Sequence, residues 1–298
     1  MGRSATVASR LQPVQRRRRL VNRCATVAIT LAFLIAVAPL ISLVYEVLIR
    51  GIGRLDVAFF TSDMRGVVGD GGGIAHAITG TLVITGLATL IAVPVGVMAA
   101  IYLVEYGRGR LARALTFLVD VMTGIPSIVA GLFAFALFVA IFGPAVRLGV
   151  MGAVALAVLM IPIVIRSAEE MLKIVPDHLR EASYALGTPK WKTIVKIVLP
   201  TALAGLVTGV MLAVARVIGE TAPLLVTAGV IDSMNLNPFD GRMQNLAVYA
   251  FSEYRTPGVF KEAAFDRVWG AALTLILIVM LLSLVARLIY RRYGTDLR

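Results

Sequence analysis

The sequence predicts an all-α polytopic membrane protein with six transmembrane helices. Of the 298 residues, 59% are hydrophobic and only 15% are charged, and the mean hydropathy is +0.88. In soluble domains about a quarter of the residues are charged, so this composition excludes a soluble domain. Six apolar stretches are long enough to cross a bilayer, which takes about 20 helical residues. We expect the spans near residues 24–49, 75–104, 115–142, 150–165, 198–229 and 269–290.

The positions of the basic residues predict which segments face the cytosol. Of the 29 Lys and Arg residues, twenty fall in the termini and in the segments after the second and fourth spans, while eight fall in the other loops. Lys and Arg accumulate on the cytosolic side of membrane proteins. We therefore expect both termini in the cytosol, as a loose basic tail at residues 1–23 and a short tail at residues 291–298. The net charge of +12 then does not indicate nucleic-acid binding.

The first span, at residues 24–50, is expected to be an uncleaved peripheral anchor. Its apolar run is too long for the core of a secretory signal. The run of arginines from Arg16 to Arg19 just before it suits anionic lipid headgroups. Residues 51–74 form an external linker, in which the glycine-rich stretch from Gly69 to Gly73 lacks the Gly-Lys-Ser/Thr of a phosphate-binding loop. We expect a flexible hinge there.

Prolines and one carboxylate mark the next three spans. Pro94 in the second span and Pro126 in the third are candidate hinges, although proline is common in membrane helices. Asp120 lies near the cytosolic end of the third span, where we expect it to pair with another helix rather than to line a pathway. The fourth span is the shortest. It contains Pro162 and is expected to end at Arg166, which can reach the interface.

The cytosolic loop at residues 166–197 predicts an elbow of two short helices. The first is expected to begin at Pro176 and to end at Gly187. Its apolar face carries Leu179, Ala182, Ser183 and Leu186. Thr188 offers a cap and Pro189 a first-turn proline for a second helix that runs toward Pro200. The charged side, which should stay out of the bilayer, carries Arg180, Glu181, Lys190, Lys192 and Lys196. From these residues alone, an interfacial anchor is the commoner explanation.

Arg216 and Glu220 interrupt the fifth span. A charge at mid-bilayer costs on the order of 2.5–3.5 kcal/mol on the insertion scale, so it should face a partner, a cavity or a solute. One explanation is that Arg216 simply pairs with Glu220 one turn later. The other is that its fork of donors binds a tetrahedral oxyanion in transit, while Glu220 neutralises the empty site and limits its affinity. Thr221 would then add a hydroxyl donor, and Pro223 would bend the helix just beyond the site.

The longest external segment, residues 230–268, is the candidate face for a solute-binding protein, and a solvated loop without a partner is the alternative. A turn is expected at residues 237–241 and a short surface helix at residues 246–254. The single cysteine, Cys24, excludes an internal disulfide, and His76 and His178 are too far apart in the sequence to suggest a metal cluster. We expect no cofactor. Because a Walker motif is also missing, ATP hydrolysis would need a separate subunit.

The elbow carries a recognisable spacing. Glu181-Ala182-Ser183, then Gly187, then an Ile-x-Leu-Pro ending at Pro200 resembles the EAA loop that importer-type ABC permeases present to their ATPase subunits. The resemblance implies a MetI-like type I permease core at residues 75–290. In that family the elbow inserts into a cleft on the ATPase. Glu181, Ala182, Ser183 and Gly187 would then couple nucleotide-driven closure to the membrane helices.

Three segments resemble PstA-type permeases, the phosphate-uptake branch of this family: GGGIAHAITGT at 71–81, REASYALGTPKWKTI at 180–194, which contains the elbow motif, and ARVIGETAPLL at 215–225. TGIPSIVAG at 123–131 resembles the pathway-lining third helix of the family. The resemblance implies import of inorganic phosphate across a prokaryotic plasma membrane. It also implies a PstC-like second permease, two PstB-like ATPases and an extracytoplasmic PstS-like phosphate-binding protein. The pathway residues would be Arg216, Glu220 and Thr221. The helix hinges would be Pro94, Pro126, Pro200 and Pro223.

Three other functions remain open at this point. A permease for sulfate or molybdate would carry a similar elbow and a similar Gly-Ile-Pro-Ser in the third span. A membrane enzyme acting on phosphorylated lipid would need a catalytic base or metal ligands near Arg216, where the sequence offers only Glu220 and Asp120. A passive anion channel gives no reason for an ATPase-docking elbow.

Overall fold

The computed structural model describes the backbone of residues 4–293 and the side chains of residues 17–288. Within that range every regular element is a helix, which confirms the expected all-α class. The chain divides into two units, Met1–Ile49 and Arg50–Arg298. The ends of the two expected tails, residues 1–3 and 294–298, lie outside the described residues.

The first unit consists of most of one long helix, α1 (Ser4–Ile52). Its apolar part and the arginines before it form a candidate span at Arg17–Ile52. At 1.5 Å per residue the 49 residues extend about 74 Å, more than twice the hydrocarbon core of a bilayer. The basic tail is therefore helical from Ser4 on, and the expectation of a loose tail is wrong there. The tail holds seven arginines, and arginine readily extends a helix that the apolar span has nucleated.

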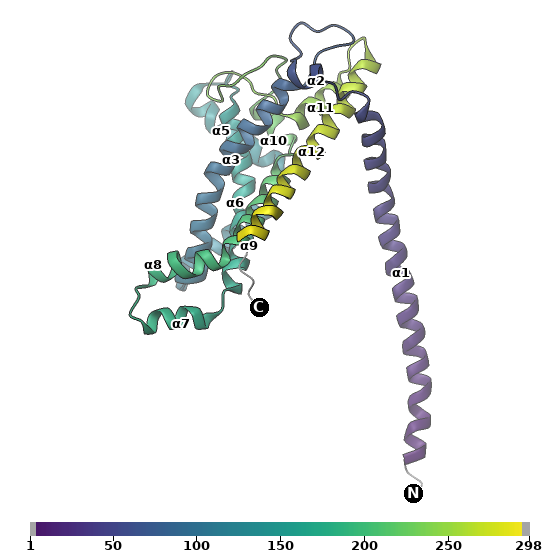
Figure 1. Ribbon diagram of the computed structural model, residues 1–298, viewed down its shortest axis with the longest axis vertical. Coiled ribbons are helices and arrows are strands. Elements are labelled where there is room, and N and C mark those ends of the chain that lie inside the picture. Colours follow the sequence, from purple (N-terminus) through teal and green to yellow (C-terminus); the bar gives the residue numbers. More distant parts are fainter. Residues whose placement is uncertain (1–3, 294–298) are drawn as a thin grey trace. The chain divides into compact units, whose positions relative to one another are not determined.

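The second unit is built on four long helices that run side by side (Figure 1). They are α3 (Ala75–Ile101), α6 (Gly149–Ile174), α9 (Leu199–Val217) and α12 (Lys261–Tyr293). Small residues let the backbones approach closely: Gly209 on α9 faces Ser167 on α6, and Gly96 on α3 faces Val164. The core that these helices bury consists largely of alanines, with Ile84, Leu156, Met160 and Leu224.

The fourth span is longer than expected. It runs to Ile174 rather than to residue 165, because Arg166 does not end the helix. Arg166 instead pairs with Glu169, at 2.9 Å one turn later, and with Asp120 on a neighbouring helix. Paired in this way, the guanidinium no longer needs to reach the interface by ending the helix.

Two of the expected spans are broken. In place of one span at 115–142 there are α4 (Gly109–Thr123) and α5 (Ser127–Phe142), which meet at an angle of 108°. In place of one span at 198–229, α9 ends at Val217 and α10 (Ala222–Thr227) follows a gap. Pro126 and Pro223 lack the N–H that a continuous helix needs. The described residues therefore hold five candidate spans, or the expected six if α4 and α5 together count as one.

One end of the four long helices carries the elbow (Figure 1). Its first helix, α7 (Asp177–Ala185), and its second, α8 (Lys190–Thr193), confirm the expected pair, joined through Gly187 at φ +72°. α8 continues through the π-helical segment η2 (Ile194–Val198) into α9 without a break. The expected cap by Thr188 is wrong. Pro189 holds the N-cap position, and Thr188 uses its backbone N–H to bond the carbonyl of Ser183 at 3.2 Å.

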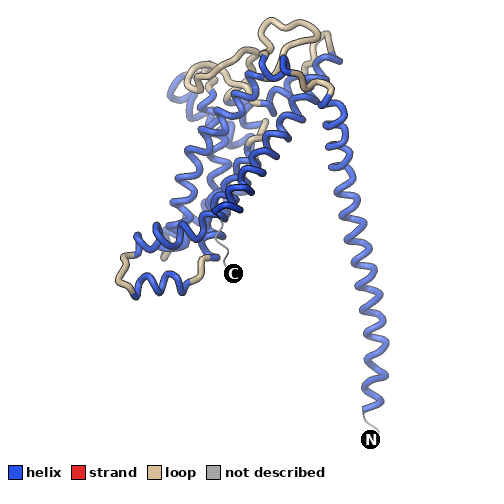
Figure 2. The backbone as a smooth tube through the Cα atoms, viewed as in Figure 1, coloured by secondary structure: helices blue, strands red, loops and turns tan. Residues whose placement is uncertain are grey.

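The opposite end, here called the loop end, consists of loops, drawn tan in Figure 2, and two short helices. α2 (Val57–Thr61) lies in the linker, and α11 (Leu246–Arg255) confirms the surface helix expected in the long loop. The turn expected at 237–241 ends at Gly241 with φ +69°. Buried Tyr249 packs edge-on against His76, with ring centroids 5.4 Å apart. Burial raises the pKa of the Tyr249 phenol above its ordinary value, so the ring stays neutral.

The contact between α5 and α10 yields a stability prediction. A Cβ added to Gly131 would lie 2.5 Å from the Cα of Pro223 and 2.9 Å from its carbonyl oxygen. Gly131→Ala should therefore force the two helices apart at a cost of about 1–3 kcal/mol and lower the thermal unfolding temperature of the purified protein in detergent. Gly86→Ala is the matched control, since nothing lies within 4 Å of its added Cβ. Equal unfolding temperatures for the two variants would contradict this packing.

Candidate functional site

The two helix breaks meet at one cavity of about 300 Å³. The break between α4 and α5 supplies one wall, the middle of α6 supplies a second, and the end of α9 supplies the third. The lining residues are Met122, Thr123, Ile125, Pro126, Ser127, Leu159, Pro162, Ile163, Arg216, Val217 and Glu220. Two of the three pathway residues expected from the sequence, Arg216 and Glu220, therefore lie on a cavity.

Arg216 occupies the last turn of α9 and is largely unengaged. Its Nη1 lies 3.7 Å from Oε1 of Glu220, which is an ion pair beyond hydrogen-bond distance. The Arg216 side chain is 65% exposed, whereas that of Glu220 is 15% exposed. The Arg216–Glu220 pair, the first of the two explanations drawn from the sequence, is thus present. It is too loose to occupy the guanidinium, whose donors remain open to a ligand.

The backbone around Glu220 is fixed by Asn245. The Glu220 N–H bonds the carbonyl of Val217 at 3.1 Å, and the Glu220 carbonyl accepts a bond from Nδ2 of Asn245 at 3.2 Å. Asn245 is also the N-cap of α11, where its Oδ1 accepts from the N–H of Val248 at 2.9 Å. One buried amide therefore ties the helix break to α11. Sequence reasoning missed Asn245, because its partner lies 25 residues away.

The hydroxyl groups at the cavity differ from the expected one. Thr221 does not line the cavity. It stands at the N-cap of α10, where its carbonyl accepts from the N–H groups of Leu224 and Leu225, each at 3.1 Å. Thr123 and Ser127 line the cavity instead, and the Thr123 hydroxyl donates to the carbonyl of Val119 at 2.9 Å. The Gly-Ile-Pro-Ser run was the available signal for Ser127.

Asp120 has the structural role that the sequence predicts. It pairs with Arg166 and so joins α4 to α6 below the cavity. Of the four expected hinges, Pro126 and Pro223 stand at the helix breaks, Pro94 lies inside α3, and Pro200 lies in the first turn of α9 directly after η2. Among the described residues, no group of three or more His, Cys, Asp or Glu side chains gathers in a way that could hold a metal ion.

The elbow divides into an outer and an inner face. Glu181 and Ala182 are exposed, and so are three large side chains beside them: Tyr184, Leu186 and Trp191. Ser183 points inward, where its hydroxyl lies 2.8 Å from that of Thr193 on α8 and links the two elbow helices. Arg180 was expected on the outer charged side, and this is wrong. Its side chain is only 12% exposed, because it pairs with Glu105 at the end of α3.

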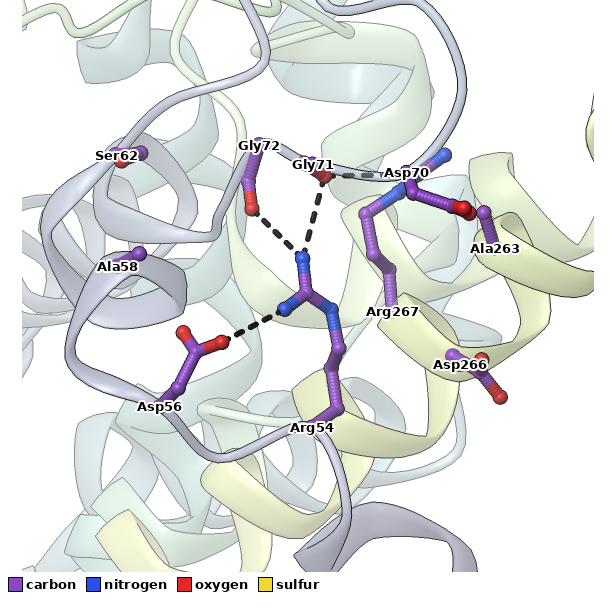
Figure 3. A pocket seen from close by; sticks show the side chains of 10 residues that line it. All are labelled: Arg54, Asp56, Ala58, Ser62, Asp70, Gly71, Gly72, Ala263, Asp266 and Arg267. Carbon is purple, nitrogen blue, oxygen red and sulfur yellow. Dashed lines mark hydrogen bonds and ion pairs between the residues drawn. The ribbon is translucent and has the colours of Figure 1, made fainter.

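A second cavity, of about 410 Å³, lies at the loop end (Figure 3). Arg54 donates to the carbonyls of Gly71 and Gly72 at 3.3 and 3.2 Å, and Arg267 donates to those of Gly69 and Gly71 at 3.0 and 3.3 Å. Each arginine also has a carboxylate partner within 3.1 Å. The glycine-rich stretch is therefore held by two cations, and the expectation of a flexible hinge is wrong.

The fold and the site together define a polytopic membrane permease: apolar helices surround a cavity with an exposed cation, and a helical elbow projects from one end. The chain belongs to the family described as the inner membrane component of binding-protein-dependent transport systems, whose profile matches residues 92–298. It is a multi-pass inner-membrane transport subunit and not an enzyme. Transporters of this kind combine such a permease with a second permease, an ATPase and a binding protein.

Similar proteins support this assignment. The chain is 48% identical over 281 residues to phosphate transport system permease protein PstA 1 of Mycobacterium tuberculosis (strain CDC 1551 / Oshkosh), covering 93% of this chain and 91% of the relative. It is 49% identical to PstA of Mycobacterium leprae (strain TN), with 90% and 88% covered. It is 40% identical to PstA of Yersinia pestis, with 98% and 97% covered.

Solved structures confirm the expected MetI-like fold. A chain of the inward-facing MetNI methionine ABC transporter matches with a TM-score of 0.57 and 22% identity, covering 75% of this chain and 95% of that one. A chain of a bacterial ABC transporter that imports the acidic polysaccharide alginate matches with a TM-score of 0.63 and 12% identity, covering 96% and 100%. At these identities the likeness concerns the fold alone.

Proposed function

We propose that this chain is a permease subunit of an ATP-driven importer of inorganic phosphate and forms half of its translocation pathway. The observation that carries the proposal is the Arg216 guanidinium, 65% exposed on a cavity and only loosely paired with Glu220 at 3.7 Å. The relatives named as phosphate permeases, 48% and 49% identical over most of the chain, support the choice of cargo.

The chemistry of the cavity suits a phosphate ion. A guanidinium stays charged at any working pH, and its planar fork binds two oxygens of a tetrahedral oxyanion at once. Glu220 neutralises Arg216 in the empty site and yields when the anion arrives, so the ion is not held too tightly to leave. The Ser127 hydroxyl on the facing wall is the better placed donor than Thr221, which lies off the cavity.

Partners and orientation follow from the surfaces. Both termini lie in the cytosol in this proposal, because most Lys and Arg residues fall on that side. The exposed outer face of the elbow, with Glu181 beside Leu186 and Trp191, suits the cleft of a PstB-like ATPase. A PstC-like permease would complete the pathway, and a phosphate-loaded PstS-like protein would dock at the external end near residues 230–268.

The mechanism proposed is alternating access. ATP binding closes the two ATPases and moves the elbow that lies between them and the membrane. From Lys190 to Val217 the chain is one unbroken helical run, so movement of α8 reaches the last turn of α9 without passing through a flexible joint. Arg216 stands in that turn. The cavity therefore changes its accessible side when the elbow moves.

Arg216→Lys tests the cargo assignment. Lysine keeps the charge but loses the fork, so uptake of labelled phosphate by vesicles holding the full complex should fall on the order of ten-fold. Arg65→Lys, at an exposed external position, is the control and should transport normally. Uptake by the Arg216→Lys complex at the control rate would refute the role of the guanidinium. If unlabelled sulfate or molybdate competes better than unlabelled phosphate, the cargo is another oxyanion.

Gly187 and Glu181 test the coupling role of the elbow. Gly187 has φ +72° and open space where a Cβ would stand, so a side chain there causes backbone strain of roughly 1–2 kcal/mol and no clash. Gly187→Val should lower the phosphate transported per ATP hydrolysed, whereas Gly187→Asn should lower it less, because asparagine tolerates this conformation. Glu181→Ala should act like Gly187→Val. Normal transport per ATP in Gly187→Val and Glu181→Ala would exclude the elbow as the coupling element.

A further inference from the structure

A buried ion pair joins the elbow to the cytosolic end of α3. Glu105 lies in the π-helical segment η1 (Tyr102–Tyr106), which ends α3. Its Oε1 accepts a hydrogen bond from Nε of Arg180 at 3.0 Å and lies 2.9 Å from Nη2 in the ion pair. The two side chains are only 5% and 12% exposed. A pair this shielded is screened far less by salt and water than a surface pair, so it holds its two elements together.

All three guanidinium nitrogens of Arg180 are engaged within the chain. Besides Glu105, it donates to the carbonyl of Val175, to the carbonyl of Leu172 at 3.0 Å, and to the exposed carboxylate of Asp177 at 3.0 Å. Leu172 lies in the last turn of α6, where helix carbonyls lack partners within the helix. One guanidinium therefore joins the first elbow helix to the ends of both α3 and α6.

The second elbow helix reaches the same place. Lys190, the first residue of α8, donates to the backbone carbonyl of Glu105, and its Nζ lies 4.6 Å from the ring centroid of Tyr106. Both halves of the elbow thus hold two adjacent residues at the end of α3. The widened π-helical turn there is a rare form that is frequently found at functional sites.

The cavity needs such a connection. The elbow is covalently continuous with two helices: Val175 and Pro176 join it to α6, and η2 joins it to α9. It has no short covalent route to α3. α6 supplies Leu159, Pro162 and Ile163 to the cavity, and α3 packs against α6 along its length. If the elbow moved α6 and α9 alone, α6 would have to slide along α3. The Arg180–Glu105 pair passes the same movement to α3.

We propose that Glu105 is a positioning residue for energy coupling: its bond to Arg180 makes α3 follow the elbow, so that the α6 wall of the Arg216 cavity and the helix packed against it move in one step. This inference rests on the proposed function for its cargo and its ATPase. Loss of the bond should leave ATP hydrolysis running while transport lags. A pair that only stabilised the fold would change the unfolding temperature and leave the ratio of transport to hydrolysis intact.

The test compares two carboxylates that bind the same arginine. The full complex with Glu105→Ala, or with Asp177→Ala, is reconstituted in proteoliposomes, and the binding protein is added to the assay. Coupling between sites commonly amounts to 5-fold or more, so Glu105→Ala should transport about five-fold less labelled phosphate per ATP hydrolysed. Asp177, which is 88% exposed, should be dispensable. An unchanged ratio for Glu105→Ala would overturn the proposal.

A covalent substitute separates the link from folding. Cys24 is the single native cysteine, so Cys24→Ser provides a background for Glu105→Cys with Arg180→Cys. Bridging the two cysteines with a short bismaleimide should raise the transport per ATP that the double variant has lost. A bridged complex that stays uncoupled would also overturn the proposal. Uptake by the wild-type complex is measured alongside: if it does not import phosphate, the proposed cargo fails, whatever the variants do.

Discussion

The presence of a guanidinium within an apolar bundle is the constraint on which the rest of the structure depends. In a continuous span, a permanent partner would have to offset the free-energy cost of burying the charge of Arg216. Here α9 ends one residue later, at Val217, so Arg216 stands at a helix C-terminus, where unpaired carbonyls favour a cation by about 0.3–1 kcal/mol. Glu220 lies within the break, with its Oε1 3.7 Å from Nη1 of Arg216. The bundle therefore tolerates the charge of Arg216 without a partner that occupies its hydrogen-bond donors.

The helix break in turn depends on close packing. Pro223 removes a donor at the start of α10 and so prevents α9 from continuing. The freed segment does not unfold, because Gly131 on α5 allows the Pro223 backbone to approach closely and Asn245 holds the Glu220 carbonyl. α5 itself begins at the other break, after Pro126. Each broken helix therefore supports the other, and the cavity is the space that the two breaks leave beside α6.

Local chemistry was predictable from the sequence, whereas partners distant in the chain were not. The elbow, its stop at Gly187 and the external helix at 246–255 follow from glycine, proline and periodicity within a few residues. Hydropathy counts apolar residues but does not show whether the helix through them is continuous. The predicted spans therefore joined α4 to α5 and α9 to α10. Arg180 was placed on the wrong face because Glu105 lies 75 residues earlier. Thr221 was preferred to Ser127 because it follows Glu220 in the sequence. In the structure Ser127 lines the cavity and Thr221 does not.

Arg180 and Arg216 show how partners decide what one residue type does. Both side chains carry the same charge and the same fork of donors. The donors of Arg180 are taken by two carbonyls and two carboxylates, and burial makes those bonds costly to break, which suits a part that transmits movement. Among the described residues, Arg216 has only the distant carboxylate of Glu220, and its exposed donors can exchange ligands at little cost. A saturated guanidinium can hold two helices together, and an open one can bind and release an anion. The helical run from Lys190 to Val217 joins the two functions, because it begins at the residue that helps to hold α3 and ends one residue past Arg216.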